Sequence, residues 1–299
     1  MTWFERINEA IEYIESNLGS DIEFEEIERI ACYSITNFQK VFSVIANVSL
    51  SEYIRRRRLT LAALELQTSD VKIIDIALKY GYDSPEAFTR AFNNLHGISP
   101  SSARKNGVLL KAFPRISILL TIKGDAGMDY RIEEKNAFRV YGIEEIYTYD
   151  GIKNAQGRTI PEVWQDIIKD GRFGKLCESV EKNWLADSGF TTRTGEVFAY
   201  DSYKQISSTT FPYLIGCYLS LKSKPEGFTI VDVPAATWAI FSTLGNKTPD
   251  LHALKKRIYT EWLPTTNYKI LEDHGVFEMY YVTDNGEEGC ELWYSVKVK

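Results

Sequence analysis

Apolar residues between positions 73 and 104 recur at the three- and four-residue spacing of amphipathic helices. One face of a first helix collects Ile73, Ile76, Ala77 and Tyr80. Gly81 then permits a sharp turn, and Ser84 followed by Pro85 is the usual start of another helix. The pattern predicts two helices joined by a tight turn.

The second of these helices has an apolar back and a polar front. Its inward positions are Phe88, Ala91, Phe92 and Leu95. Its outward positions are Glu86, Thr89, Arg90 and Asn93. A short helix that carries hydrogen-bonding side chains outward and is held by a tight turn is suited to reading a DNA major groove.

The same pattern occurs fifty residues earlier. Ser34 aligns with Ser84, and a polar front of the earlier helix is formed by Thr36, Asn37, Gln39, Lys40 and Ser43. Ala31 stands where Gly81 stands in the later copy. We expect Ala31 to adopt a left-handed backbone at a cost of about 1 kcal/mol. Two further helices precede this copy, at residues 2–19 and 22–30, with Phe24, Ile27 and Ile30 of the latter facing inward.

A longer helix is expected between the two copies, and it carries four consecutive arginines at 55–58. These side chains spread around most of a helical turn, so they cannot share one role. We expect Arg55 to contact phosphate and Arg58 to be structural, with Asp75 as its partner. A solvated charged face is the alternative interpretation of this run.

Net charge is −6 for the 299 residues, but the charge is unevenly distributed. Residues 1–28 contain one basic and nine acidic residues, a net charge of −8. Residues 29–107 contain eleven basic and six acidic residues, a net charge of +5. Basic charge is therefore concentrated where phosphate contact is expected.

The later copy resembles the DNA-binding domain of AraC/XylS transcription regulators. The residues that carry the resemblance are Ile76-Ala77, Gly81-Tyr82, Ser84, Phe88, Arg90, Phe92, Gly97, Ser99-Pro100 and Arg104. It implies a tandem helix-turn-helix domain over residues 1–107 that binds double-stranded promoter DNA, with RNA polymerase as a further partner. A helical hairpin without a DNA role is the alternative.

The resemblance also implies which side chains contact DNA. Ser34, Thr36, Asn37, Gln39 and Lys40 would act in the first unit, with Arg55 on the connecting helix. Ser84, Glu86, Thr89, Arg90 and Asn93 would act in the second. Related proteins often have glutamine where Glu86 stands. A carboxylate there repels phosphate but can accept a hydrogen bond from cytosine, so it should narrow the DNA sequence that is bound.

After a linker at 108–127, residues 128–299 change to strand patterns with a few helices. Strands are expected at 130–134, 138–147, 196–201, 213–221, 228–233, 237–244, 276–283 and 290–298, and helices at 161–168 and 251–262. Two strand pairs should turn at residues 136–137 and 234–235. The chain is thus an all-α domain followed by an α+β module with pseudo-twofold symmetry.

This second region resembles the GyrI-like effector-binding domain. The residues that carry the resemblance are Ile132-Glu133-Glu134-Lys135, Ala137-Phe138, Val233-Pro234-Ala235 and Glu291-Leu292-Trp293. It implies a small-molecule effector, often lipophilic and cationic, bound among aromatic side chains and a buried acid.

Strand alternation indicates which acid and which rings could form that pocket. Glu291 and Trp293 point to one side of the last strand, and Glu278 and Tyr280 share a side of the preceding one. Further candidates are Tyr141, Trp164, Trp238 and Tyr218. A carboxylate beside aromatic faces attracts a cation. The alternative is that the rings are ordinary core and Glu291 lies on the surface.

Other function classes receive less support. The four cysteines and three histidines have no metal-binding spacing, so we expect no metal and no cofactor. No Ser-His-Asp or Cys-His constellation is recognisable, and we expect a non-enzyme. Two alternatives remain open for the second region: hydrolysis of a small molecule, or docking of a protein without a ligand. The start of the chain is acidic and no apolar run is long enough to span a bilayer, so we expect a cytoplasmic protein without a membrane partner.

Overall fold

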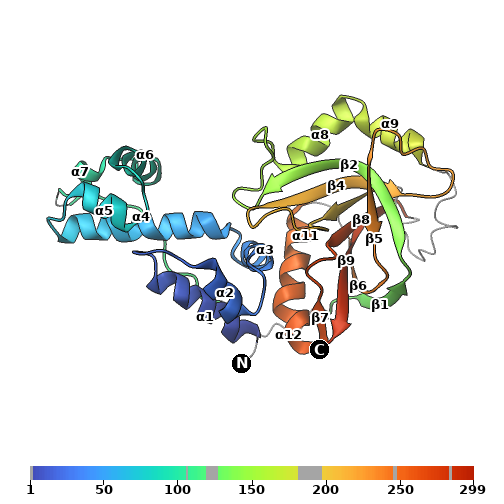
Figure 1. The fold of residues 1–299 in the computed structure, drawn as a ribbon, viewed down its shortest axis with the longest axis horizontal. Coiled ribbons are helices and arrows are strands. Elements are labelled where there is room, and N and C mark those ends of the chain that lie inside the picture. The colour runs from blue at the N-terminus through green and yellow to red at the C-terminus, as the bar shows by residue number, and fades with distance from the viewer. Residues whose placement is uncertain (1–2, 106, 119–126, 181–196, 245–247, 283–284) are drawn as a thin grey trace. The chain divides into compact units, whose positions relative to one another are not determined.

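The chain folds into two compact units, residues 1–120 and 121–299 (Figure 1). The computed structural model describes residues 3–105, 107–118, 127–180, 197–244, 248–282 and 285–299. Unit 1 is helical, and unit 2 is built on one large antiparallel sheet with helices against it. The predicted order of an all-α part followed by an α+β part is confirmed.

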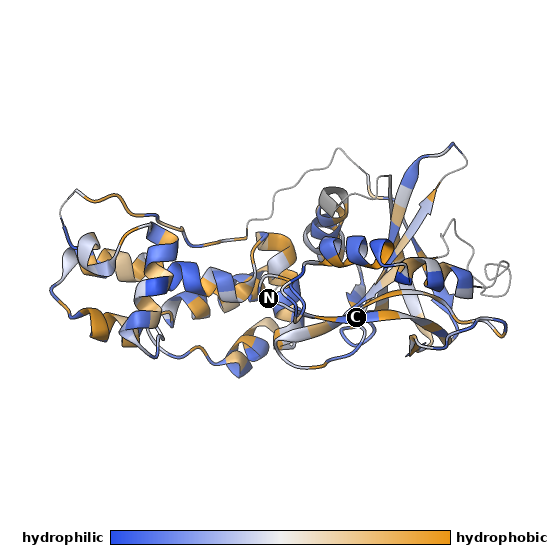
Figure 2. Cartoon of the chain, turned by 90° about the horizontal axis from the view of Figure 1, so that it is seen from above, coloured by the Kyte–Doolittle hydropathy of each residue, from blue (hydrophilic) through white to orange (hydrophobic). Residues whose placement is uncertain are grey.

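The helices of unit 1 follow the predicted hydrophobic pattern. They are α1 (Trp3–Ser16), α2 (Phe24–Ala31), α3 (Ile35–Ala46), α4 (Leu50–Thr68), α5 (Ile73–Lys79), α6 (Pro85–His96) and α7 (Pro100–Ala103). Serine hydroxyl oxygens accept backbone N–H groups at the starts of α3, α4, α6 and α7. The serines are Ser34, Ser49, Ser84 and Ser99, in that order. Hydrophobic and hydrophilic residues alternate along these helices (Figure 2).

Two local predictions in unit 1 are wrong. Phe24 is 38% exposed rather than inward, because it is the first residue of α2 and lies at its open end. The left-handed residue after α2 is Cys32, with φ of 55°, while Ala31 stays within the helix. The turn of the first copy is therefore one residue later than that of the second, where Gly81 has φ of 77°. The predicted start of α1 at Thr2 lies outside the described residues.

The four arginines of α4 do not share one role. Arg58 donates to the carbonyl oxygens of Leu18 and Ser20, at 3.0 and 2.9 Å, and so ties down the chain that follows α1. Its structural role agrees with the prediction, but Asp75 is not the partner in these contacts. Arg55 and Arg56 both pair with Glu52 on the same helix.

The segment that follows α7 packs back along unit 1. The backbone N–H of Phe113 donates to Thr60 Oγ1 at 3.1 Å, and that of Ile116 donates to the Tyr53 hydroxyl at 3.2 Å. Asn8 on α1 exchanges two hydrogen bonds with the backbone of Ile118, each 2.9 Å long. Residues 108–118 of the predicted linker form neither helix nor strand, and residues 119–126 lie outside the described residues.

Unit 2 contains most of the predicted strands and both predicted helices. The strands are β1 (Tyr130–Lys135), β2 (Phe138–Thr148), β3 (Phe198–Asp201), β4 (Thr210–Tyr218), β5 (Thr229–Val233), β6 (Ala236–Leu244), β7 (Tyr268–Ile270), β8 (Val276–Val282) and β9 (Glu288–Val298). The helices are α8 (Ile160–Lys169), α9 (Arg172–Ser179), α11 (Thr248–Arg257), the π-helical turn η1 (Ile258–Trp262) and α12 (Leu263–Thr265). Helix α9 and strand β7 were not predicted.

The strand order is β1-β6-β9-β8-β3-β4-β2-β5, with β7 also paired to β9. Two four-stranded halves therefore meet at β8 and β3, as the pseudo-twofold prediction requires. The predicted hairpins at residues 136–137 and 234–235 are wrong, however. Strand β1 pairs with β6, and β2 pairs with β5. Each short link carries the chain from one half of the sheet into the other, so the halves exchange their edge strands.

The two faces of the sheet have separate cores. One core contains Trp238, Phe277 and Trp293, and we call this side the Trp293 face. The other contains Tyr141, Tyr213 and residues of α8 and α9, and we call it the helix face. Helices α8 and α9 lie over β2 and β4 in Figure 1. The Trp293 face is closed by rings from distant strands, since Phe138 of β2 lies 5.9 Å from Phe277 of β8.

Candidate functional site

Helix α6 presents the predicted DNA-facing side chains. Phe88, Phe92 and Leu95 are buried behind it. Glu86, Arg90 and Asn93 are exposed on its front, and Thr89 is partly exposed. Ser84 accepts the backbone N–H of Ala87 at 3.2 Å and fixes the start of the helix. The front of α6 thus offers a carboxylate, a guanidinium, a hydroxyl and an amide for base and phosphate contacts.

Helix α3 is the matching element of the first copy. Ser34 accepts the backbone N–H of Asn37, and Glu28 of α2 accepts that of Ile35 at 2.7 Å. Thr36 and Lys40 are partly exposed, whereas Asn37 and Gln39 are buried in this structure. Contact of Asn37 and Gln39 with DNA therefore requires these side chains to become exposed, and it stays a prediction.

The eight predicted effector residues do not form one site. Residues paired across antiparallel strands share a face. Met279 pairs with Glu291, whereas its neighbour Glu278 pairs with Leu292, so the two glutamates lie on opposite faces. The Trp293 face takes Glu291, Trp293, Trp238 and Tyr218, and the helix face takes Glu278, Tyr280, Tyr141 and Trp164. The predicted residues therefore divide between two separate sites, one on each face of the sheet.

On the Trp293 face, Glu291 is already neutralised by the chain itself. Arg131 donates to both of its carboxylate oxygens, at 2.8 and 3.1 Å, and Trp293 Nε1 donates at 3.0 Å. Burial opposes charge on Arg131, but the bonds to Glu291 and Glu133 outweigh it and raise the pKa of the guanidinium. Trp238 and Trp293 are fully buried. The predicted surface alternative for Glu291 is wrong, since its exposure is 5%.

On the helix face, Glu278 lies at the centre of a polar and aromatic group that we call the Glu278 cluster: Trp164, Tyr213, Lys255, Glu278 and Tyr280. Lys255 Nζ of α11 is 2.6 Å from Glu278 Oε1. The Tyr280 hydroxyl donates to Oε2 at 2.8 Å and that of Tyr213 at 3.5 Å. Trp164 of α8 donates to the Tyr213 hydroxyl at 3.3 Å, so both helices and two strands contribute.

The electrostatics of the Glu278 cluster keep one carboxylate and one ammonium together. Burial opposes charge on Lys255, but the attraction of Glu278 and Asp201 outweighs it and raises the pKa of the ammonium. Burial and the neighbouring Glu278 raise the pKa of Tyr280, which stays a hydroxyl donor. The side chains of Trp164, Lys255 and Tyr280 are only partly buried, so the cluster reaches the protein surface.

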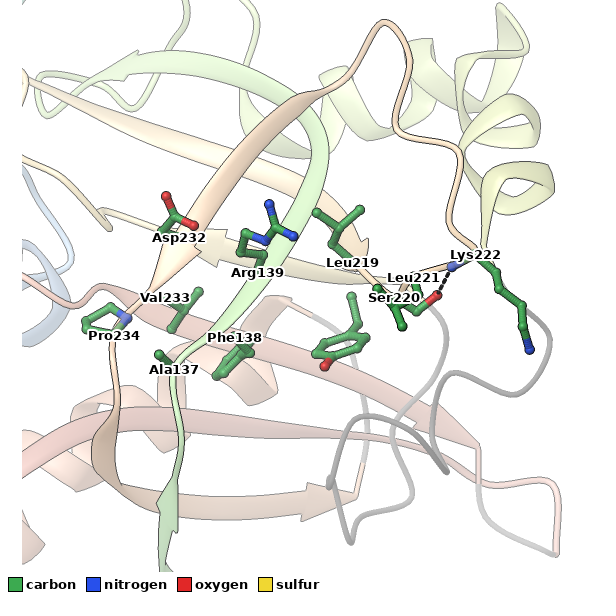
Figure 3. Close-up of a pocket in the computed structure, with 11 residues that line it drawn as sticks. Ala137, Phe138, Arg139, Leu219, Ser220, Leu221, Lys222, Asp232, Val233 and Pro234 are labelled. Atoms are coloured by element: carbon green, nitrogen blue, oxygen red, sulfur yellow. Dashed lines mark hydrogen bonds between the residues drawn. The ribbon is translucent and has the colours of Figure 1, made fainter.

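A cleft of about 930 Å³ lies beside the two short links that join strands of different halves (Figure 3). Ala137 and Pro234 of the two links line it, together with Phe138 of β2 and Tyr218 of β4. The rings of Phe138 and Tyr218 lie 6.2 Å apart. Charged side chains of the lining are Arg139, Lys222 and Asp232. Tyr218 is the only predicted effector residue in this lining.

Three residues of these sites were missed from the sequence: Lys255, Tyr213 and Arg131. Arg131 precedes Ile132-Glu133 on β1, where strand alternation alone gives no partner. Lys255 lies among three consecutive basic residues of α11, and such runs are usually solvated. No signal in the sequence would have selected this one lysine, because its role depends on α11 packing over β8.

Other chemistries find no support in the part of the chain that the structure describes. No group of three or more His, Cys, Asp or Glu side chains there is arranged to hold a metal ion. No helix there is long and apolar enough to cross a membrane.

Helix-turn-helix units followed by an α+β module of this topology define a one-chain DNA-binding transcription regulator with a small-molecule binding domain. Residues 27–106 match the helix-turn-helix domain family, and residues 128–297 match the GyrI-like small molecule binding domain. The chain belongs to the GyrI-like family and carries an AraC-type DNA-binding domain at its start.

Known relatives match about a third of the chain. The HTH-type transcriptional activator AarP of Providencia stuartii is 44% identical over 98 residues, which is 33% of this chain and 73% of AarP. The regulatory protein SoxS of Escherichia coli K12 is 34% identical over 98 residues, which is 33% of this chain and 92% of SoxS. The structure of SAV2435 bound to tetraphenylphosphonium is a distant likeness of fold, with 14% identity, a TM-score of 0.44, and coverage of 57% of this chain and 94% of that one.

Proposed function

We propose that this transcription regulator binds its promoter through the fronts of α3 and α6 and responds to a lipophilic cation at the Glu278 cluster. The exposed side chains of α6 support the first part. The single observation that carries the second is a buried carboxylate held by a cation and by two tyrosine hydroxyls beside Trp164. The activator function of AarP supports RNA polymerase as a further partner.

Glu278 suits a cationic effector better than Glu291 does. Arg131 holds both oxygens of Glu291, and a guanidinium in such a paired geometry is hard to displace. Lys255 makes a single contact through a flexible stem. The rings of Trp164 and Tyr280 meet edge to face at 6.0 Å beside the carboxylate, and such rings add cation–π attraction of about 0.5–2 kcal/mol.

Arg90→Ala tests the DNA-reading role of α6. Arg90 is exposed on the front of the helix, where arginine commonly reads guanine. We expect the variant to lose about 1–3 kcal/mol of specific binding and to relax one base position. A binding selection from random DNA measures both effects. Asn94→Ala, a change at another exposed position of α6, is the matched control. An unchanged sequence preference in Arg90→Ala would remove Arg90 from base readout.

A titration with three probes of similar shape tests the effector class: tetraphenylphosphonium, neutral triphenylphosphine oxide and the tetraphenylborate anion. We expect saturable quenching of tryptophan fluorescence by the cation alone. Glu278→Gln should weaken cation binding about tenfold or more, since it removes the charge that the cation pairs with. Glu291→Gln is the matched control and should bind like the wild type.

The result also separates the other proposals for unit 2. Sensitivity to Glu291→Gln instead of Glu278→Gln would move the site to the Trp293 face. Loss of binding in Tyr218→Ala, with both glutamine variants unaffected, would move it to the cleft of Figure 3. Turnover of a probe would favour the hydrolase alternative. Capture of a protein partner without binding of any probe would favour a docking module.

A further inference from the structure

Lys255 places a positive charge where the proposed effector would place its own. Its ammonium is 2.6 Å from Glu278 Oε1, and the two side chains are 14% and 9% exposed. The tyrosine hydroxyls of the cluster bind the other oxygen, Oε2. Lys255 therefore binds one oxygen of the carboxylate, and the two hydroxyls bind the other.

We propose that Lys255 is a tethered cation that competes with the effector, so that binding is an exchange of one cation for another at Glu278. This inference rests on the function proposed above. An exchange is favoured over simple addition because a buried carboxylate without a partner is strongly unfavourable. When the ligand cation replaces the ammonium, Glu278 is never left alone. Lys255 can leave because the arriving cation takes its place on Glu278 and because lysine is readily hydrated.

The exchange makes Lys255 a determinant of specificity. A ligand must supply a positive charge and enough aromatic contact with Trp164 and Tyr280 to outcompete an ammonium held on the same chain. Small hydrophilic cations lack that contact and are excluded. Apparent affinity for the effector is lower when Lys255 occupies the carboxylate for a larger fraction of the time. The strength of the Lys255–Glu278 pair therefore sets the effector concentration at which the protein responds.

The exchange also changes what holds α11 against the sheet. The Lys255–Glu278 pair joins α11 to β8, and it is broken when the effector binds. Helix α11 continues into the π-helical turn η1, whose Tyr259 packs edge to face on Tyr294 of β9 at 5.9 Å. Release at Lys255 removes this ion pair and leaves the buried Leu251 and Leu254 of α11 and Tyr259 of η1 as the remaining contacts.

Lys255→Met tests the proposal, because it removes the charge and keeps a chain of similar length. At a fixed pH, we expect tetraphenylphosphonium to bind the full-length variant about tenfold more tightly than it binds the wild type. Binding of triphenylphosphine oxide should not change. Lys256→Met, at the exposed neighbouring position, is the matched control and should leave both affinities unchanged. Glu278→Gln/Lys255→Met should lose the gain.

A second measurement does not depend on a variant that folds. Lys255 of the wild type should react slowly with an amine-methylating reagent and faster when tetraphenylphosphonium is bound, as read by mass spectrometry of the peptide that contains it. Unchanged affinity in Lys255→Met, or unchanged methylation of Lys255 under saturating cation, would overturn the exchange. Wild-type binding that is lost in Glu278→Gln but insensitive to Lys255 would overturn the exchange alone. Failure of all variants to bind the cation would overturn the effector class as well.

Discussion

Gly142→Ala is expected to destabilise unit 2 by about 3 kcal/mol or more, at the upper end of what overpacking costs. Gly142 of β2 lies opposite Gly216 of β4. A Cβ at position 142 would stand 2.1 Å from the carbonyl oxygen of Ile215 and 2.5 Å from the Cα of Gly216. Both are backbone atoms, so no side chain can rotate away and the two strands must separate.

A urea titration followed by tryptophan fluorescence measures this loss, because five of the six tryptophans lie in residues 121–299. The matched control is Gly174→Ala in α9, where an added Cβ meets nothing within 4 Å. Alanine favours a helix over glycine by about 0.5–1 kcal/mol, so this control should be slightly more stable than the wild type. Equal midpoints for the two variants would contradict the close approach of β2 and β4.

Arg57→Leu is expected to cost unit 1 about 3–5 kcal/mol, as breaking a buried ion pair does. Arg57 of α4 donates to both carboxylate oxygens of Glu15 on α1, and the side chains are 12% and 9% exposed. It also donates to the carbonyl oxygen of Phe113 at 2.6 Å. The substitution leaves Glu15 buried and still hydrogen-bonded to the Tyr53 hydroxyl, and it removes one of the bonds that hold the segment after α7.

Hydrogen exchange of peptides from α1 and α4 measures the loss within the full chain. Glu15→Leu/Arg57→Leu removes both charges and should recover much of the stability. Arg55→Leu is the matched control on the same helix, because the Arg55 side chain is 40% exposed and exposed pairs contribute at most about 1 kcal/mol. Equal losses in Arg55→Leu and Arg57→Leu would show that burial of the pair has no special weight.

The Arg57–Glu15 ion pair also makes the stability of unit 1 depend on pH in the acid range. Burial by itself raises the pKa of Glu15, but hydrogen bonds from Arg57 and Tyr53 outweigh it and hold the pKa below the usual 4.5. The stabilisation is therefore complete above pH 4.5 and is lost as pH falls through the lowered pKa. The difference between wild type and Arg57→Leu should shrink over that acid range.

Local sequence signals predicted most of the helices and strands. Serine caps, the proline after Ser84 and apolar spacing act within a few residues, so they located α3 and α6 and the outward side chains of α6. On α3, Asn37 and Gln39 were predicted to face outward but are buried. The left-handed turn residue after α2 was misplaced by one position. Gly81 marks the left-handed turn residue of the second copy, but its position does not transfer to the first. The first copy extends its helix through Ala31 and turns at Cys32.

Residue patterns along the chain were enough to predict the two-part organisation, the helix-turn-helix pair and which residues of one strand share a side. The exchange of β1 and β5 between halves, and the placement of Glu278 and Glu291 on opposite faces, became visible only in the folded sheet. Alternation has a period of two within a strand, but register between strands depends on distant packing. For the same reason, the pairing of Lys255 with Glu278 and of Arg131 with Glu291 could be identified only from the packing of α11 and β1.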